Sequence, residues 1–217
     1  QCVVCGKVEV WLCEPCAQKL TPYQGVCCPR CGSPTEQEAT LCANCRSNPH
    51  RLKVAPIRSA FVLQDTIRAA VHALKYRGGR EIATRLASHM KQAWNNAAME
   101  SDILIPVPLH PEREARRGYN QSALLAIALG KQINIPVEVN ALMRVRNTRS
   151  QTQLGFAERQ INVRGAFTTT GMIDITDKRV TLIDDVATTG ATLNACAEAL
   201  LARGASQVNA FTLTRAS

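Results

Sequence analysis

The sequence predicts an α/β domain with a mostly parallel sheet flanked by helices, preceded by a small cysteine-rich module. Apolar stretches that suit strands alternate with amphipathic stretches that suit helices from residue 57 onward. Nine of the ten cysteines lie within the first 45 residues. The 217 residues allow one ordinary domain of about 150 residues and a small addition. We therefore expect a boundary near residue 50, with 1–50 as the module and 51–217 as the α/β domain.

Eight of the nine cysteines of the module form four pairs, and each pair has two residues between its thiols. This spacing lets both sulfurs of a pair reach one tetrahedral ion from a tight turn. Eight ligands suffice for two closed sites of four sulfurs, and closed sites are structural because no position is left for substrate. We predict a zinc-ribbon-like module with two structural zinc ions, held by Cys2, Cys5, Cys13, Cys16, Cys28, Cys31, Cys42 and Cys45.

The spacing leaves the grouping of these ligands open, because sequential and interleaved arrangements both suit it. Cys27 is expected to stand outside both sites, and Cys196, far downstream, to serve core packing. Redox chemistry is the competing interpretation, but four tandem pairs outside a thioredoxin-like context disfavour it. A secreted disulfide scaffold is disfavoured by the regular spacing and the absence of an export signal. Because the module holds few apolar residues, we expect it to need metal to fold.

The formal net charge of +9 belongs to the second part of the chain. Residues 1–50 hold four basic and four acidic side chains, and eight thiolates with two zinc ions would add negative charge. The module is thus a poor match for nucleic-acid phosphates, and docking to a partner or stabilising the chain is favoured instead. Residues 113–164 hold nine basic and three acidic side chains, which predicts an anionic ligand or partner there.

The elements of the α/β domain are expected in the following order. A polar linker, 47–56, leads to a strand at 57–63 and an amphipathic helix at 64–76 that Gly78 and Gly79 end. A second helix should span 80–95, a buried strand 102–110, a third helix about 120–133 and a short strand 135–139. Asn120 is expected to cap the third helix, with Gln121 as a surface amide.

The remaining elements surround a long polar stretch. Residues 141–167 are rich in arginine and lack clear periodicity, so we expect a functional loop. Strands at 165–170 and 179–186, a helix at 191–205 and a last strand at 207–216 should complete the domain.

The stretch TLIDDVATTGATL, residues 181–193, carries the clearest chemical signal. In parallel sheets ligands bind beyond the carboxyl ends of strands, where this stretch leaves one. Threonine hydroxyls and the amides around Gly190 suit a phosphate at the start of the next helix. Asp184 and Asp185 cannot bind that phosphate, but they suit sugar hydroxyls or a magnesium ion beside it. One ligand matches both halves, a ribose with a 5′-phosphate. The stretch is not a Walker loop, because no Gly-Lys-Ser/Thr is present.

This pattern resembles the 5-phosphoribosyl-1-diphosphate (PRPP) motif of type I phosphoribosyltransferases. The downstream part resembles the ComF/GntX-like family, phosphoribosyltransferase-fold proteins associated with bacterial competence and DNA utilisation, and the paired cysteines suit that family too. The resemblance covers nearly the whole chain. It rests on LKY (74–76), IPVPL (105–109), RRGYNQS (116–122), RVRNTRSQTQL (144–154), ERQINVRGAF (158–167) and the PRPP-type motif.

The resemblance implies roles for individual residues. Asp184 and Asp185 would be the catalytic pair, contacting ribose hydroxyls or a magnesium ion that accompanies PRPP. Arg113, Arg116 and Arg117 would be counter-charges for the pyrophosphate, although a solvated approach to a helix explains Arg116 and Arg117 equally well. Arg144 to Arg159 matches the hood that closes over PRPP in catalytic relatives, with DNA backbone as its alternative ligand. The 5′-phosphate would be cradled by Ala187, Thr188, Thr189, Gly190, Ala191 and Thr192.

The sequence is compatible with three functions. The first, favoured by the resemblance, is a protein of DNA uptake with a phosphoribosyl-binding pocket and a basic face for single-stranded DNA. The second is an active phosphoribosyltransferase, for which no acceptor is identifiable. The third is a non-catalytic ligand sensor or adaptor. Because only 4% of residues are aromatic, any DNA binding should depend on backbone phosphates.

The location and partners follow from the same reasoning. No run of 18 apolar residues is present, so we expect no transmembrane segment. We expect a cytoplasmic protein that a motor or channel of DNA uptake can hold at the inner face of the membrane.

Overall fold

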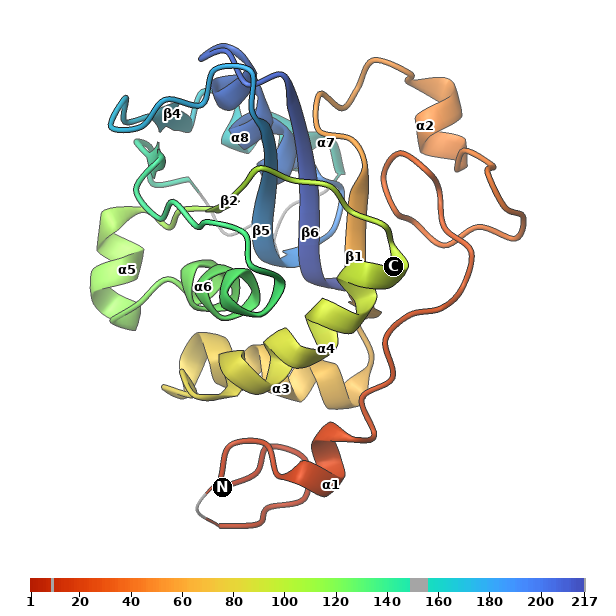
Figure 1. Ribbon diagram of the computed structural model, residues 1–217, viewed down its shortest axis with the longest axis vertical. Helices are drawn as coiled ribbons and strands as arrows, with labels where there is room; N and C mark the ends of the chain where they lie inside the picture. The colour runs from red at the N-terminus through yellow and green to blue at the C-terminus, as the bar shows by residue number, and fades with distance from the viewer. Residues whose placement is uncertain (9, 149–155, 217) are drawn as a thin grey trace.

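A four-stranded parallel sheet forms the centre of the molecule, and it confirms the predicted α/β class (Figure 1). The computed structural model describes residues 1–8, 10–148 and 156–216. Every neighbouring pair in the order β1-β6-β5-β2 is parallel. The carboxyl ends of the strands therefore meet at one edge, where ligands of such sheets bind. The strands are β1 (Ile57–Val62), β6 (Gln207–Arg215), β5 (Arg179–Ala187) and β2 (Ile103–Pro106).

Helices cover both faces of this sheet. On β5, Leu182 points into the core beneath α8, whereas the next residue, Ile183, points into the core beneath α4 and α6. Both side chains are fully buried, so each face of the sheet has its own apolar core. One face carries α3 (Asp65–Tyr76), α4 (Ile82–Asn96) and α6 (Gln121–Ile133), and the other carries α7 (Phe156–Val163) and α8 (Ala191–Leu201).

The cysteine-rich segment is divided between these two faces. Cys2, Cys13 and Cys16, with α1 (Glu14–Ala17), pack into the core of α3 and α4. Cys28, Cys31 and Cys45, with α2 (Ala43–Ser47), pack into the core of α8. In Figure 1, α1 lies below α3, whereas α2 lies to the upper right of β1. Both cores of the sheet therefore include cysteines from the start of the chain.

Several predicted elements differ from the structure. The long loop predicted at 141–167 was wrong, because it contains strand β3 (Leu142–Arg144) and the helix α7. β3 pairs antiparallel with β4 (Phe167–Thr169), and residues 149–155 lie outside the described residues. The predicted linker was also wrong in character, since Leu52 and Val54 are buried in the core of α8.

Two short segments explain the other differences. The strand predicted at 135–139 is a single parallel bridge between Val137 and Leu104, where Pro136 has no N–H to extend the pairing. Helix α5 (Pro111–Arg117) was not predicted, because seven residues are too few for a hydrophobic period. His110 caps α5 and Gly118, at φ 81°, ends it.

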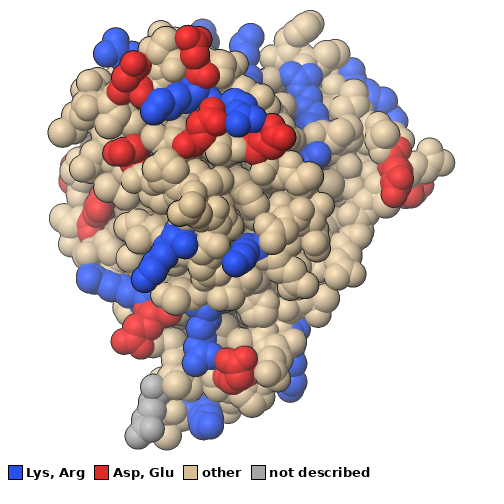
Figure 2. Space-filling view, in the orientation of Figure 1, with Lys and Arg blue, Asp and Glu red and all other residues tan. Residues whose placement is uncertain are grey.

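The surface carries its charges in mixed order on the face shown in Figure 2, where Lys and Arg side chains are interspersed with Asp and Glu. This face therefore shows no large patch of positive charge alone. None of the helices in the described ranges has the length and apolar character needed to cross a bilayer.

Candidate functional site

A pocket of about 510 Å³ opens at the carboxyl ends of the parallel strands. Leu63 follows β1, Val107 follows β2 and Ala216 follows β6, and all three line it. Asp184 and Asp185, near the end of β5, line the same pocket. The strand ends thus bring the acid pair to the edge of the sheet where a ligand is expected.

The two aspartates are held by groups from three elements. Asp184 Oδ1 accepts hydrogen bonds from the Ser122 hydroxyl at 2.8 Å and from the backbone N–H of Asp185 at 2.9 Å. Asp185 Oδ1 accepts from the Gln121 side-chain amide at 3.2 Å, and its Oδ2 lies 2.5 Å from the Lys75 ammonium. Apart from the Lys75 ion pair, this buried oxygen has no hydrogen-bond partner among the described residues. Lys75 is therefore the compensating charge of the acid pair.

Burial disfavours the negative charge of Asp184. Desolvation first, and the neighbouring charge of Asp185 second, raise the pKa of Asp184 to about 7. The Ser122 hydrogen bond and the Lys75 charge oppose this rise in the pKa. Asp184 therefore holds a proton more readily than an exposed carboxylate would, and a cation brought to it would favour its ionised form.

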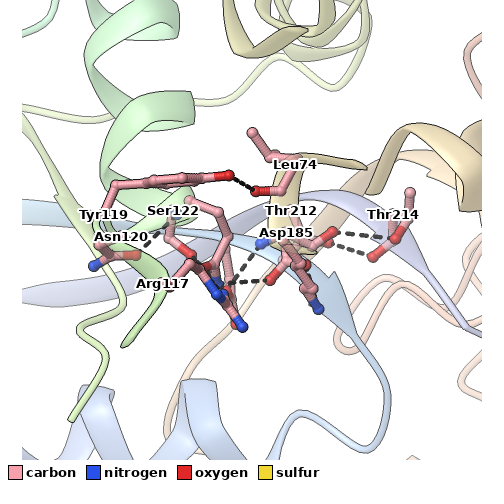
Figure 3. Close-up of polar contacts among 11 residues, drawn as sticks. Leu74, Arg117, Tyr119, Asn120, Ser122, Asp185, Thr212 and Thr214 are labelled. Atoms are coloured by element: carbon pink, nitrogen blue, oxygen red, sulfur yellow. Dashed lines mark hydrogen bonds and ion pairs between the residues drawn. The ribbon is translucent and has the colours of Figure 1, made fainter. Parts of the chain in front are cut away.

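The start of α6 places Gln121 and Ser122 beneath the aspartates. Asn120 Oδ1 accepts from the Ser122 N–H at 2.9 Å, so the predicted cap is present, and its amide donates to the Val107 carbonyl. The hydroxyl of Tyr119 donates to the Leu74 carbonyl at 2.6 Å, tying this corner to α3 (Figure 3). Gln121 is buried and was wrongly predicted as a surface amide, because its role depends on a partner 64 positions away.

The threonine-glycine turn after β5 lies at the same edge. Gly190, at φ 79°, precedes α8 without a side-chain cap, and Thr189 Oγ1 accepts from the Ala191 N–H at 3.3 Å. Thr188 and Thr192 line the pocket of the acid pair. Thr189 instead lines a neighbouring pocket beside Cys31. Of the other predicted phosphate residues, Ala187 and Ala191 are buried and Gly190 packs against Ile57.

The three predicted arginines all lie on α5. Arg113 and Arg117 line the acid-pair pocket, whereas Arg116 lines only an adjoining open pocket of about 640 Å³. Arg113 donates to the Thr148 carbonyl and Arg117 to the Gln121 side chain. The Arg117 guanidinium also lies 5.3 Å from the centre of the Tyr76 ring, which is exposed. Lys75 lines both pockets, so positive charge runs continuously from one to the other.

The expected hood is only partly described. Arg144 is buried on β3, where it donates to Thr148 and lies 5.3 Å from the centre of the Phe167 ring. It also lines the acid-pair pocket. Arg146, also in the predicted hood, donates to the Arg164 carbonyl at 2.7 Å. Residues 149–155 of the predicted hood lie outside the described residues.

The eight paired cysteines form two groups of four in sequential order. The sulfur atoms of each group lie within 4.8 Å of one another, and tetrahedral zinc with sulfur at about 2.3 Å requires about 3.8 Å between sulfurs. The sulfurs of Cys5 and Cys13, and those of Cys31 and Cys42, are 3.5 Å apart. The thiols fit a structural zinc ion in each group, and Cys27 belongs to neither. The groups are Cys2, Cys5, Cys13, Cys16 and Cys28, Cys31, Cys42, Cys45, the first and second cysteine clusters.

Without a cation the thiols of a cluster resist ionisation together. Burial and the charge of Cys31 raise the pKa of Cys45 to about 12, whereas backbone N–H groups outweigh burial and lower the pKa of Cys28 to about 6. A divalent cation removes this conflict, because it stabilises all four thiolates at once.

The acid pair fits a magnesium ion less well. Among the described residues no histidine, cysteine or further acid joins Asp184 and Asp185 to form a set of three ligands. The Lys75 ammonium already forms an ion pair with Oδ2 of Asp185, at 2.5 Å. The described residues alone thus form no ready magnesium site at the acid pair, and oxygens of a ligand would have to complete one.

Lys75, Gln121 and Ser122 were not predicted as site residues. Their signals were the LKY and NQS segments, which the family resemblance includes but to which spacing assigns no chemistry. Only the folded chain shows that both segments meet the acid pair.

Known proteins are similar to this chain over nearly its whole length. Residues 115–217 match the model of the family described as phosphoribosyl transferase domain. The chain is 31% identical to Competence protein ComFC of Bacillus subtilis over 215 residues, covering 96% of this chain and 86% of that protein. It is 29% identical to Competence protein F of Haemophilus influenzae, covering 100% and 97%. It is 30% identical to the DNA utilization protein YhgH of Salmonella typhimurium, covering 94% and 90%.

Among solved structures, the chain is similar to glutamine phosphoribosylpyrophosphate amidotransferase from B. subtilis, with 22% identity and a TM-score of 0.44. That similarity covers 65% of this chain and 30% of the other. From the relatives that match it over most of its length, together with the strand-end acid pair and the two cysteine clusters, it follows that the chain belongs to the ComF/GntX-like family of competence and DNA-utilisation proteins, which have a phosphoribosyltransferase domain.

Proposed function

We propose that the pocket at the strand ends binds PRPP or another 5′-phosphoribosyl ligand. The observation that carries the proposal is that one pocket is lined both by the acid pair, Asp184 and Asp185, and by Thr188 and Thr192 of the turn that follows it. Carboxylates accept hydrogen bonds from ribose hydroxyls, and the start of α8 favours the 5′-phosphate. A pentose that carries a 5′-phosphate satisfies both ends of this arrangement.

The cations beside the acid pair suit a second anionic group. Lys75, Arg113 and Arg117 line the same pocket and compensate more charge than the two aspartates carry. A diphosphate on C1 of the ribose would meet these groups, and magnesium would arrive bound to its oxygens. This supports PRPP over a plain ribose phosphate as the preferred ligand.

Ligand binding can be tested against a change of the acid pair. PRPP with magnesium at about 100 times its Kd is expected to stabilise the chain by about 2.7 kcal/mol, raising the melting temperature by about 5–10 °C. The double variant Asp184→Asn, Asp185→Asn should lose this shift, because neutral amides cannot accept the ribose hydroxyls as strongly. Thermal melts with and without PRPP measure both.

A matched control exists at the other end of the sheet. Asp102 lies just before β2 and pairs with Arg179 at 2.7 Å, away from the pocket. Asp102→Asn should keep the full PRPP shift. An equal shift in the acid-pair variant and the unmodified protein would reject this pocket.

The biological role we propose is handling of single-stranded DNA during uptake or utilisation, as the names of the relatives indicate for those proteins. Arg113, Arg116 and Arg117 line an open pocket together with the exposed ring of Tyr76. No described contact ties Arg116 to another residue, which leaves its charge available to a phosphate. A cytoplasmic location, with a DNA-uptake motor or channel as partner, accords with this role.

DNA binding predicts a specific dependence on salt. Changing Arg113, Arg116 and Arg117 together to Gln should weaken binding of an oligothymidine strand and reduce the slope of log affinity against log salt by about 2, since each phosphate contact contributes about 0.7. Fluorescence anisotropy at several salt concentrations measures this. The pair Lys178→Gln and Arg203→Gln, both exposed and remote from the pocket, is the control. An unchanged slope in the arginine variant would place the DNA surface elsewhere.

Catalysis is a second candidate, favoured by the cations beside the acid pair. Transfer would break the bond between C1 and the diphosphate oxygen, which leaves with the electron pair, while an acceptor forms the new bond to C1. Release of pyrophosphate from PRPP in the presence of candidate acceptors distinguishes an enzyme from a binding protein.

A further inference from the structure

Two arginines donate hydrogen bonds to backbone carbonyls of the threonine-glycine turn after β5, the predicted phosphate site. Arg215, the last residue of β6, donates to the Thr188 carbonyl at 3.1 Å. Arg51 donates to the next carbonyl, that of Thr189, at 2.8 Å. Two consecutive peptide groups of the turn are therefore fixed by cations from outside it.

Both arginines connect this turn to the second cysteine cluster. The buried Arg215 guanidinium also donates to the Cys31 carbonyl at 2.5 Å and to the Ser33 hydroxyl at 2.7 Å. Arg51 follows α2, which carries Cys45.

Because the peptide bond is planar, a hydrogen bond to a carbonyl of the turn also fixes the direction of the N–H in the same peptide group. In a trans peptide the carbonyl and the N–H of one group point in opposite directions. These peptide groups are trans, since the cis bond of the described chain is Ala55–Pro56. With the Thr188 carbonyl drawn toward Arg215, the N–H of Thr189 faces away from the cluster. The hydrogen bond from Arg51 to the Thr189 carbonyl likewise turns the N–H of Gly190 away from the cluster.

Thr188 separates two pockets. It lines the pocket of the acid pair on one side, and on the other a pocket of about 400 Å³ lined by Cys31, Arg51 and Arg215. Carbonyls turned toward the first pocket would repel a phosphate, whereas N–H groups would bind it. The orientation of these two peptide groups thus decides whether the turn attracts an anion.

We propose that Arg215 and Arg51 are positioning residues through which the second cysteine cluster keeps the turn in its phosphate-binding orientation. The proposal rests on the proposed function, since it concerns the 5′-phosphate of that ligand. It assigns different roles to two similar clusters. The second cluster supports ligand binding, whereas the first, which contacts α4 through the Glu14–Arg85 ion pair at 2.7 Å, supports only the fold.

The test compares ligands that use different ends of the pocket. Affinities for ribose 5-phosphate and for inorganic pyrophosphate are measured by calorimetry well below the melting temperature. Arg215→Met is expected to weaken ribose 5-phosphate about tenfold or more, the loss of about one charge-assisted hydrogen bond. Pyrophosphate should bind as before, because the cations that suit it lie at Lys75, Arg113 and Arg117. Arg51→Met, at a less buried position, should show the same selectivity and serves if Arg215→Met fails to fold.

Controls separate positioning from general stability. Arg85→Met removes the exposed arginine link beside the first cluster and should leave both affinities unchanged. Arg215→Lys keeps the charge and should recover part of the lost ribose 5-phosphate affinity. Equal losses for both ligands, or no loss for ribose 5-phosphate, would overturn the positioning role alone. Failure of the unmodified protein to bind ribose 5-phosphate would overturn the proposed function together with it.

Discussion

Chelation of metal from both cysteine clusters is expected to unfold the first 50 residues and to lower the melting temperature of the remainder by more than about 10 °C. Closed four-cysteine sites contribute about 10–16 kcal/mol of apparent binding free energy near pH 7, and this energy is also folding energy. The effect should reach the α/β domain, because buried cysteines of each cluster belong to one of its two cores. Metal analysis should give two zinc ions per chain, and circular dichroism melts with a strong chelator measure the loss.

Single substitutions separate the two sites. Cys5→Ser should remove one zinc ion from the first cluster and Cys42→Ser one from the second. Cys27→Ser is the matched control, because Cys27 stands beside Cys28 but belongs to neither cluster, so both ions should stay. One zinc ion per unmodified chain, or an unchanged melt after chelation, would contradict two structural sites.

The cysteine spacing predicted eight ligands, but it was silent about where they would lie. Paired thiols are a local signal, since each pair needs only a tight turn. Whether Cys13 joins Cys2 or Cys28 depends on how the chain returns, which spacing does not encode. The division of the clusters between opposite faces of the sheet depends on more distant contacts still. The Arg215 guanidinium, for example, meets the carbonyl of Cys31 across 184 positions.

The sheet was predictable for a physical reason. Strands β5 and β6 are buried at most of their positions, and both combine apolar with β-branched residues, as in the VTLI segment of β5, which favours a strand. The short elements were missed because β3 has three residues and α5 has seven, fewer than a hydrophobic period needs to show itself. Boundaries within the arginine-rich stretch therefore came from tertiary contacts, such as β3 with β4.

The motif around the acid pair predicted a nearby positive charge, but not the residue that supplies it. Two adjacent aspartates at a strand end predicted that positive charge must be present nearby. The sequence suggested arginines after β2 and a magnesium ion, whereas the nearest cation in the fold is Lys75 on α3, about 110 positions upstream. Since electrostatic compensation acts through space, no local pattern identifies the residue that supplies it.

Lys75→Met is accordingly expected to destabilise the chain by about 3–5 kcal/mol at neutral pH, the usual cost of removing one partner from a buried ion pair. The variant leaves Asp185 Oδ2 buried without its only described partner. It also removes a charge that holds down the pKa of Asp184. Urea unfolding of both proteins measures the difference, with Lys131→Met, an exposed lysine of α6, as the control.

The pH dependence of this loss distinguishes charge from packing. The pKa of Asp184 in the folded protein, about 7, lies above its unfolded value of about 3.9, so the group favours folding below the unfolded value and that contribution is lost as the pH rises through the folded one. Removal of Lys75 raises the folded pKa further, so the destabilisation should be small near pH 4 and should grow through pH 7 and beyond. Adding Asp185→Asn to Lys75→Met should restore most of the stability at neutral pH, since the uncompensated charge is then gone. A loss that is constant with pH and persists in the double variant would mean that the lysine stem, and not its charge, matters at this site.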